Sequence, residues 1–146
     1  ELCNDLNFTL SPSYAIVMPV ERLIDYCEGK VDEKTSKLAD LLLVGIEKGL
    51  EIAKPYKHFP CRFLTNQVNI HWDGSVPLCC VTFDRKTSTI ANDFLKISLK
   101  DLSKRKDNHP QCVKCVKNSI PPYMLNVNLK EWDKEAKKFG FVEALG

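Results

Sequence analysis

The sequence predicts an α+β fold, with a small β-hairpin and helices around a site of four cysteines, preceded by a helical segment. Three features of the 146-residue chain support this prediction. Apolar residues recur every three or four positions up to residue 53, apolar and polar residues alternate around an Asp-Gly pair at 73–74, and a Cys-x-x-Cys sequence follows at 112–115. With 44% hydrophobic and 27% charged residues, the composition is that of a globular protein.

The chain begins with two runs of strand-like composition, Leu6–Leu10 and Tyr14–Met18. Pro19 suits the first turn of a helix, and we expect about two helical turns over Glu21–Glu28, ending near Gly29. This part of the chain is therefore predicted to contain both strand and helix.

A single amphipathic helix of about five turns is predicted from Asp32 to Ala53. Asp32 or Thr35 can cap its start, and Pro55 ends it. Lysine and acidic residues share its polar face, which favours packing on a sheet over binding to a membrane. Its apolar face consists of Leu38, Leu41, Leu42, Ile46, Gly49, Leu50 and Ala53.

A β-hairpin is predicted after Cys61. Residues Val68–Trp72 alternate between apolar and polar, and Asp73-Gly74 supplies a two-residue turn. The returning strand contains Pro77, which lacks an amide and therefore requires an edge or an irregular position. Because successive side chains of a strand point to opposite faces, one residue of the pair Cys79-Cys80 can bind a metal while the other packs.

Short helices are expected in the remaining third of the chain. Ser98 is a suitable N-cap for a helix over Leu99–Lys104. A turn over Asp107–Pro110 then leads into the Cys-x-x-Cys, where we expect loop amides to point toward the cysteine sulfurs. The pair Pro121-Pro122 interrupts the chain again.

The last predicted helix covers Leu129–Phe139. Asn128 and Glu131 have the spacing of a cap at its start, and Gly140 closes its end. This helix is expected to extend beyond the region of the cysteines.

Seven cysteines occur in the chain. Their odd number and the adjacent pair at 79–80 favour reduced thiols in the cytoplasm over the disulfide framework of a secreted domain. Cys3 and Cys27 have no second thiol at ligand spacing, so both are expected to be small buried side chains.

The other candidate thiols are Cys61, Cys79, Cys112 and Cys115, with Cys80 as the reserve for Cys79. Thiolates are soft ligands that favour zinc or an iron-sulfur cluster over magnesium or calcium. Structural zinc sites commonly use two short Cys-x-x-Cys pairs, whereas the first two candidates here are 18 positions apart. We therefore favour a cluster gripped from separate loops, and zinc is the alternative.

Charge and hydropathy exclude other classes of partner. The net charge is +2, from 21 basic and 19 acidic residues, so no electrostatic argument for nucleic acid exists. No apolar run approaches the roughly 20 residues of a membrane span. His58, His71 and His109 lack partners at ligand spacing, so we expect none of them to bind metal.

The order of these motifs resembles the SPASM family, the auxiliary-cluster domains at the C-terminal side of radical SAM enzymes. The similarity covers about residues 60–116. It rests on three segments. In the first, twelve residues separate Cys61 from Gly74 and four separate Gly74 from Cys79. The second is Ile90–Asp93, in which Ala91 replaces the usual glycine, and the third is Pro110-x-Cys112-x-x-Cys115.

The sequence departs from the family pattern after Cys115. No cysteine follows Cys115, whereas a full SPASM domain carries further cysteines there for a second cluster. The chain is therefore similar to the shortened twitch domain, which has a hairpin and a helix around one 4Fe-4S cluster. The resemblance implies that Cys61, Cys79, Cys112 and Cys115 hold this cluster and leave no iron open to a substrate.

The resemblance further implies an auxiliary role in a radical SAM oxidoreductase, namely electron transfer and substrate positioning in the modification of a peptide or small metabolite. The chain contains no Cys-x3-Cys-x2-Cys, the motif that holds the catalytic cluster and S-adenosyl-L-methionine. Both are therefore expected in an upstream radical SAM domain. We expect this chain to be a fragment that is not catalytic alone.

Three regions follow from this interpretation. Residues 1–59 are the end of a partial β/α barrel, with Tyr14–Met18 as its last strand and Leu38–Ala53 as its last helix. Residues 60–120 are the cluster-binding domain, and residues 121–146 are a helical extension. The alternative is a zinc-stabilised four-cysteine module that binds proteins and has no redox activity.

Overall fold

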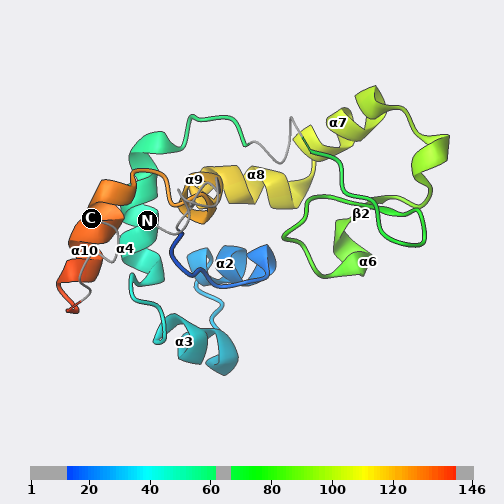
Figure 1. Ribbon diagram of the computed structural model, residues 1–146. Helices are drawn as coiled ribbons and strands as arrows, with labels where there is room; N and C mark the ends of the chain where they lie inside the picture. Colours follow the sequence, from blue (N-terminus) through cyan, green and yellow to red (C-terminus); the bar gives the residue numbers. More distant parts are fainter. Residues whose placement is uncertain (1–12, 62–66, 141–146) are drawn as a thin grey trace, which may run out of the picture.

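The computed structural model describes residues 13–61 and 67–140 (Figure 1). It is rich in helix and contains a small antiparallel sheet in which β1 pairs with β2, so the predicted α+β class is confirmed at this level. The elements in chain order are α2 (Val20–Cys27), α3 (Glu33–Ala39), α4 (Ile46–Ala53), the 3-10 helix η1 (Lys54–Tyr56), β1 (Val76–Pro77), α6 (Arg85–Ser88), β2 (Thr89–Ala91), the 3-10 helix η2 (Phe94–Lys96), α7 (Leu99–Asp107), α8 (Pro110–Lys117), α9 (Ile120–Met124) and α10 (Leu129–Lys137). None of the described helices is long and apolar enough to cross a membrane.

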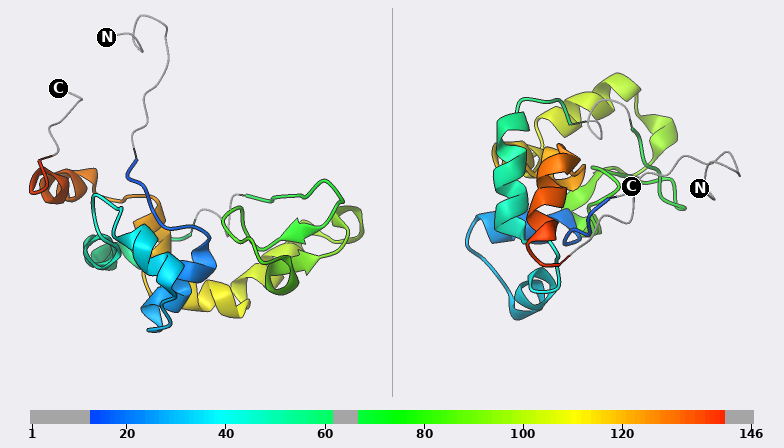
Figure 2. Two further views of the ribbon diagram at one scale, coloured as in Figure 1. Left: turned by 90° about the horizontal axis from the view of Figure 1, so that it is seen from below. Right: turned by 60° about the vertical axis from the view of Figure 1, so that its left-hand side comes forward.

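Two hydrophobic clusters hold these elements together. The larger joins α2 and α4 to α9 and α10, and the smaller joins the sheet to α7. Figure 1 and Figure 2 show α8 running between the two groups of elements. Helix α8 therefore lies where the two clusters meet, and the Cys-x-x-Cys sequence lies on this helix.

The larger cluster depends on a close approach between α4 and two aromatic rings. Tyr123 and Trp132 are both fully buried, and their ring centroids are 5.6 Å apart. Gly49 faces them, and a Cβ atom at this position would lie 2.6 Å from the Trp132 ring. Because real Cβ atoms do not approach this closely, only glycine lets α4 pack against α9 and α10 in this way.

The predicted single helix from Asp32 to Ala53 is wrong, because the chain forms two helices, α3 and α4. Asp32 caps α3 as predicted, since its side chain accepts a hydrogen bond of 2.6 Å from the Thr35 amide. The chain then leaves the helix, buries Val44 and re-enters at Gly45, whose backbone is extended. Helix α4 packs on α9 and α10. The expectation that it lies on a sheet is therefore also wrong.

The predicted strand Tyr14–Met18 is not formed. The Tyr14 amide donates to Asn126 Oδ1 at 2.7 Å and its hydroxyl donates to Asp133 at 2.5 Å, so tertiary side-chain contacts replace strand pairing. The interpretation of residues 1–59 as the end of a partial barrel stays a prediction. The run Leu6–Leu10 lies outside the described residues.

The helix expected over Glu21–Glu28 is confirmed as α2, which begins one residue earlier, at Val20. Pro19 immediately precedes this helix as its N-cap and is not part of its first turn. The predicted stop near Gly29 is confirmed, because this residue has a φ of +74°, which glycine adopts without strain.

The turn at Asp73-Gly74 is confirmed, but the predicted strand pairing is wrong. The His71 amide donates to the Ser75 carbonyl at 2.8 Å, and Gly74 has a φ of +83°. Residues 68–72 form no strand, and β1 pairs instead with β2. The physical reason is burial: Ile90 and Ala91 of β2 are buried, whereas the Trp72 side chain is 93% exposed.

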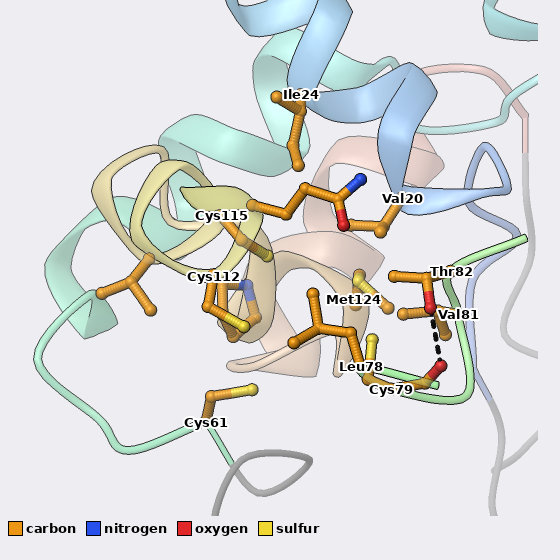
Figure 3. A pocket seen from close by; sticks show the side chains of 13 residues that line it. Val20, Ile24, Cys61, Leu78, Cys79, Val81, Thr82, Cys112, Cys115 and Met124 are labelled. Atoms are coloured by element: carbon orange, nitrogen blue, oxygen red, sulfur yellow. Dashed lines mark hydrogen bonds between the residues drawn. The ribbon is translucent and has the colours of Figure 1, made fainter. Parts of the chain in front are cut away.

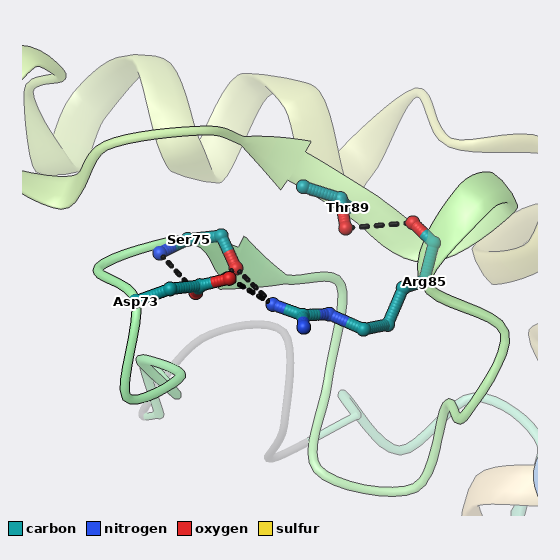
Figure 4. Close-up of polar contacts among 4 residues, drawn as sticks. All are labelled: Asp73, Ser75, Arg85 and Thr89. Carbon is teal, nitrogen blue, oxygen red and sulfur yellow. Dashed lines mark hydrogen bonds and ion pairs between the residues drawn. The ribbon is translucent and has the colours of Figure 1, made fainter.

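Polar contacts tie this turn to the segment that leads into β2 (Figure 4). Asp73 accepts hydrogen bonds from both the amide and the hydroxyl of Ser75, and the Arg85 guanidinium pairs with Asp73 and donates to the Ser75 hydroxyl at 2.9 Å. These bonds and the nearby positive charge hold the pKa of Asp73 well below its usual range. The network aligns β1 with β2, and the register shift at Pro77 agrees with the predicted irregular position.

The Cys-x-x-Cys sequence lies inside a helix, so the predicted loop with inward-pointing amides is wrong. Ser98 caps α7 as predicted, accepting from the Asp101 amide at 3.1 Å. After the predicted turn, Pro110 occupies the first position of α8, where a missing amide has no cost. The cysteines are thus held on a regular helical face.

The C-terminal helices differ from expectation at their starts. Pro121 and Pro122 lie in the first turn of α9, and Ser119, with a φ of +60°, makes the break that the prolines were expected to make. Asn128 is the N-cap residue of α10 as predicted, but its side chain makes no capping hydrogen bond. Gly140 follows this helix with a φ of +78°, in agreement with the predicted stop.

Candidate metal centre

Helix α8 presents two of the candidate thiols on one face. Cys112 and Cys115 are three positions apart, which places them one above the other on a helix. Cys112 lies in the first turn, where the helix dipole favours negative charge. His109 caps the helix, because its Nδ1 accepts a hydrogen bond of 3.3 Å from the Gln111 amide. His109 is therefore a structural residue at the site.

An ion pair contributes to holding α8 against α2. Lys114 pairs with Glu28 at 2.6 Å, and Lys30 pairs with the same carboxylate at 2.9 Å. These two partners lower the pKa of Glu28 to about 2. The neighbouring residues in sequence, Cys27 and Cys115, both pack against the larger cluster.

We expect the Glu28 contacts to stabilise the fold above about pH 4.5 and to be lost as the pH falls toward 2. The sign follows from the lowered pKa: the unfolded chain binds a proton at this group before the folded chain does. In urea unfolding, Glu28→Gln should be less stable than the wild type near neutral pH, with the difference shrinking in acid. Glu33→Gln, which breaks an exposed pair within α3, is the matched control and should have little effect. A difference for Glu28→Gln that does not change with pH would contradict this assignment.

Cys79 follows β1, and its position is set by hydrogen bonds on both sides. The Leu78 amide donates to the Ser88 carbonyl at 2.7 Å, and the Thr82 hydroxyl donates to the Cys79 carbonyl at 2.9 Å. The Cys79 side chain is half-buried, whereas Cys80 is exposed, with its sulfur 3.8 Å from Gln67 Oε1. The two neighbouring thiols therefore have different environments. The reason is not strand alternation, because β1 ends at Pro77, and Cys80 is exposed where the prediction had the second thiol packed.

The structure brings Cys61, Cys79, Cys112 and Cys115 to one cavity (Figure 3). They come from three separate segments: the chain after η1, the chain after β1, and α8. The cavity has a volume of about 30 Å³. Cys80 and Cys27 do not line it. The other lining residues are mostly apolar: Val20, Ile24, Leu78, Val81, Thr82, Gln111, Val116, Pro121 and Met124.

Burial and the proximity of other thiols disfavour the thiolate forms of Cys79, Cys112 and Cys115. Burial raises the pKa of Cys79, raises that of Cys112 to about 12 and also raises that of Cys115. The charges of the neighbouring thiols add to the effect at each of these residues. A cation that binds here must therefore displace protons, and its own charge then stabilises the thiolates.

Four cysteine sulfurs fit a soft metal group. The distances between the sulfurs help to distinguish a zinc ion from an iron-sulfur cluster. Among residues 13–61 and 67–140, no three His, Cys, Asp or Glu side chains are grouped so that they could hold a single metal ion. Thiolates around one zinc ion stand roughly 3.8 Å apart, given Zn–S bonds of about 2.3 Å. Thiolates on a cluster stand further apart because each binds a different iron atom.

The other histidines lie away from this cavity. His58 stacks on Phe59 with ring centroids 4.9 Å apart, and His71 is half-buried beside the Asp73 turn. Neither lines the cavity. Cys27 is partly buried against the larger cluster, and Cys3 lies outside the described residues.

One residue of the cavity wall and one buried lysine were not identified from the sequence. Gln111 lines the cavity, and its Oε1 atom is buried without a hydrogen-bond partner in the described part of the chain. Lys106, on α7, is only 2% exposed, and its positive charge acts on Cys112. Gln111 could have been noticed because it stands between Pro110 and Cys112. The burial of Lys106 could not be predicted, because this residue belongs to the basic run Lys104-Arg105-Lys106, which is typical of an exposed helix end.

Comparisons with known proteins add no assignment. No family model, no curated protein and no solved structure matches the chain. The functional argument therefore rests on the cysteine motifs and on the geometry of the cavity.

Proposed function

We propose that this chain is an auxiliary iron-sulfur domain of a radical SAM enzyme, in which Cys61, Cys79, Cys112 and Cys115 hold one 4Fe-4S cluster. The observation that carries the proposal is the convergence of these four thiols on one cavity with mostly apolar walls. Of the six cysteines in the described part of the chain, the four that line the cavity are the four with the family-like spacing.

The walls of the cavity suit a redox group. When bound, a 4Fe-4S cluster supplies a one-electron carrier. The apolar side chains of Val20, Ile24 and Met124 exclude water from its surroundings, which affects its potential and protects it from hydrolysis. Four protein thiolates occupy all four iron positions, so electron transfer is favoured over direct binding of a substrate.

The proposed partners are an upstream catalytic domain and its substrate. The chain has no cysteine triplet for S-adenosyl-L-methionine, so the catalytic cluster belongs to an upstream radical SAM domain. That domain would act on a peptide or a small metabolite, and the present chain would exchange electrons with the substrate radical and help to position it. A cytoplasmic location fits this role, because the site needs reduced thiols.

Anaerobic reconstitution with iron and sulfide tests the proposal. We expect a brown protein with visible sulfur-to-iron absorbance and about four iron and four sulfide per chain, the content of one 4Fe-4S cluster. The matched sample is the same protein incubated with zinc alone. Uptake of one zinc per chain, without colour in the iron-treated sample, would overturn the cluster and support the zinc-stabilised module instead.

A further inference from the structure

The cavity lined by the four cysteines contains one polar side chain whose hydrogen bonding is incomplete. Among the described residues of the cavity wall, the polar side chains other than the cysteines are Thr82 and Gln111. The Thr82 hydroxyl donates to the Cys79 carbonyl at 2.9 Å. The Oε1 atom of Gln111, in contrast, is buried and has no hydrogen-bond partner in the part of the chain that the structure describes. Because burial of a polar atom without a partner is destabilising, the position of Gln111 requires an explanation.

Gln111 is held next to two candidate ligands by its position on α8. It immediately precedes Cys112 in the sequence. It is also four positions before Cys115, so the side chains of Gln111 and Cys115 lie on the same face of the helix. The backbone amide of Gln111 donates to His109 Nδ1 at 3.3 Å, which fixes the backbone at the start of this helix. The carboxamide is therefore carried by the same rigid element as two of the four thiols.

The rest of the cavity wall explains which atoms the carboxamide can bond to. Helix α2, which packs against α8, supplies Val20 and Ile24 to the cavity. These side chains are buried and can neither donate nor accept a hydrogen bond. The polar atoms that the wall offers beside Gln111 are thus mainly the cysteine sulfurs. When a soft metal group is bound, its sulfur atoms carry negative charge, and an N–H donor beside them forms a charge-assisted hydrogen bond.

We propose that Gln111 donates a hydrogen bond from its side-chain nitrogen, Nε2, to a sulfur atom of the group that the four cysteines bind. This inference rests on the proposed function and names a residue that tunes the bound cluster. A half-turn about the last side-chain torsion exchanges Oε1 and Nε2, and this torsion has a broad, roughly two-fold preference. The exchange places a donor at the position of the unpartnered oxygen without moving the helix. Gln111 thereby gains a partner when the site is loaded.

This hydrogen bond has two consequences for a bound cluster. It stabilises negative charge on sulfur, so it slows the release of iron. It stabilises the reduced cluster more than the oxidised one, because reduction adds negative charge, so it raises the midpoint potential. The apolar walls strengthen both effects, since a hydrogen bond is electrostatically stronger where water is excluded.

Two apolar substitutions test the donor. Gln111→Met and Gln111→Leu both remove the carboxamide but differ in shape, so an effect of the hydrogen bond should be the same in both. In the anaerobically reconstituted chain, we expect each variant to release iron to a chelator about 10-fold faster than the wild type, the lower end of the range for residues outside the ligand set. The midpoint potential of both should be lower in a redox titration followed by electron paramagnetic resonance.

Asn118→Ala is the matched control, because it removes a carboxamide from the end of the same helix. The Asn118 side chain donates to the Lys114 carbonyl at 3.0 Å, and Asn118 is not among the residues that line the cavity. This variant should match the wild type in iron release and in midpoint potential.

A spectroscopic measurement detects the hydrogen bond itself. Pulsed electron paramagnetic resonance of the reduced chain in H2O and in D2O reports exchangeable protons near the cluster. We expect the wild type to show a coupling to an exchangeable proton that is missing from Gln111→Met and Gln111→Leu. In thermal unfolding, both metal-free variants should be as stable as the metal-free wild type or more stable, because an unpartnered carboxamide has been removed.

The possible failures are distinguishable. A reconstituted wild type with a cluster, together with unchanged iron release, potential and proton coupling in both Gln111 variants, would overturn this inference and leave the proposed function standing. Different effects of the two substitutions, or a loss of metal-free stability in both that includes failure to fold, would also overturn it, because packing would then explain the residue. If the wild type takes up no iron, the proposed function fails and this inference fails with it.

Discussion

Cys112→Ser is expected to remove the cluster from the reconstituted chain, whereas Cys80→Ser is expected to leave it in place. Cys112 lines the cavity, and Cys80 is exposed and does not line it. A serine hydroxyl is a harder and less acidic ligand than a thiol, so it replaces a thiolate poorly on iron. The loss should exceed the roughly 10- to 100-fold effects that are typical of residues outside the ligand set.

The two serine variants form a matched pair, because each removes one thiol from a chain that keeps six others. Iron and sulfide per chain, visible absorbance and the rate of iron release to a chelator are measured for both. Retention of iron by Cys112→Ser together with its loss from Cys80→Ser would overturn the ligand assignment. Loss from both would place Cys80 at the site and remove the distinction between the neighbouring thiols.

Gly49→Ala is expected to destabilise the protein by about 1–3 kcal/mol, the usual cost of overpacking a core. The new methyl group would meet the rings of Tyr123 and Trp132, which are fully buried and cannot move aside freely. Alanine favours a helix over glycine by about 1 kcal/mol, and this gain is too small to reverse the sign. Since α9 supplies Pro121 and Met124 to the cavity, the change should also weaken retention of iron.

Gly45→Ala is the control, because it makes the same substitution at the N-cap of the same helix and meets no atom within 4 Å. Thermal and urea unfolding of both variants, followed by circular dichroism, measures the difference. Roughly 2–4 °C of melting temperature per kcal/mol is expected for a chain of this size. A Gly49→Ala variant as stable as Gly45→Ala would show that α4 does not pack on the two rings.

Local signals in the sequence predicted local structure well. The cap at Asp32, the cap at Ser98, the turn at Gly74 and the stop at Gly140 are all present. Each depends on the backbone preference of one residue or on a hydrogen bond to a residue three positions away. Such features form wherever these residues occur, so tertiary contacts rarely alter them.

The sequence did not predict which strands pair or where a helix is interrupted. The pattern from 38 to 53 fits one helix, yet burial of Val44 divides it into α3 and α4. The alternation at 68–72 fits a strand, yet β1 pairs with β2, whose Ile90 and Ala91 are buried in the cluster that includes α7. In both places the choice depends on which apolar surface a distant segment can cover, and periodicity alone does not contain this information.

The sequence by itself determined which thiols have ligand spacing and where the turns and caps lie, because these properties depend on neighbouring residues. Only the tertiary structure decided that Cys61, Cys79, Cys112 and Cys115 meet at one cavity and that Cys80 stays outside it. The physical reason is that the two hydrophobic clusters position α8 between them. Burial against these clusters sets the distances between segments that are far apart along the chain.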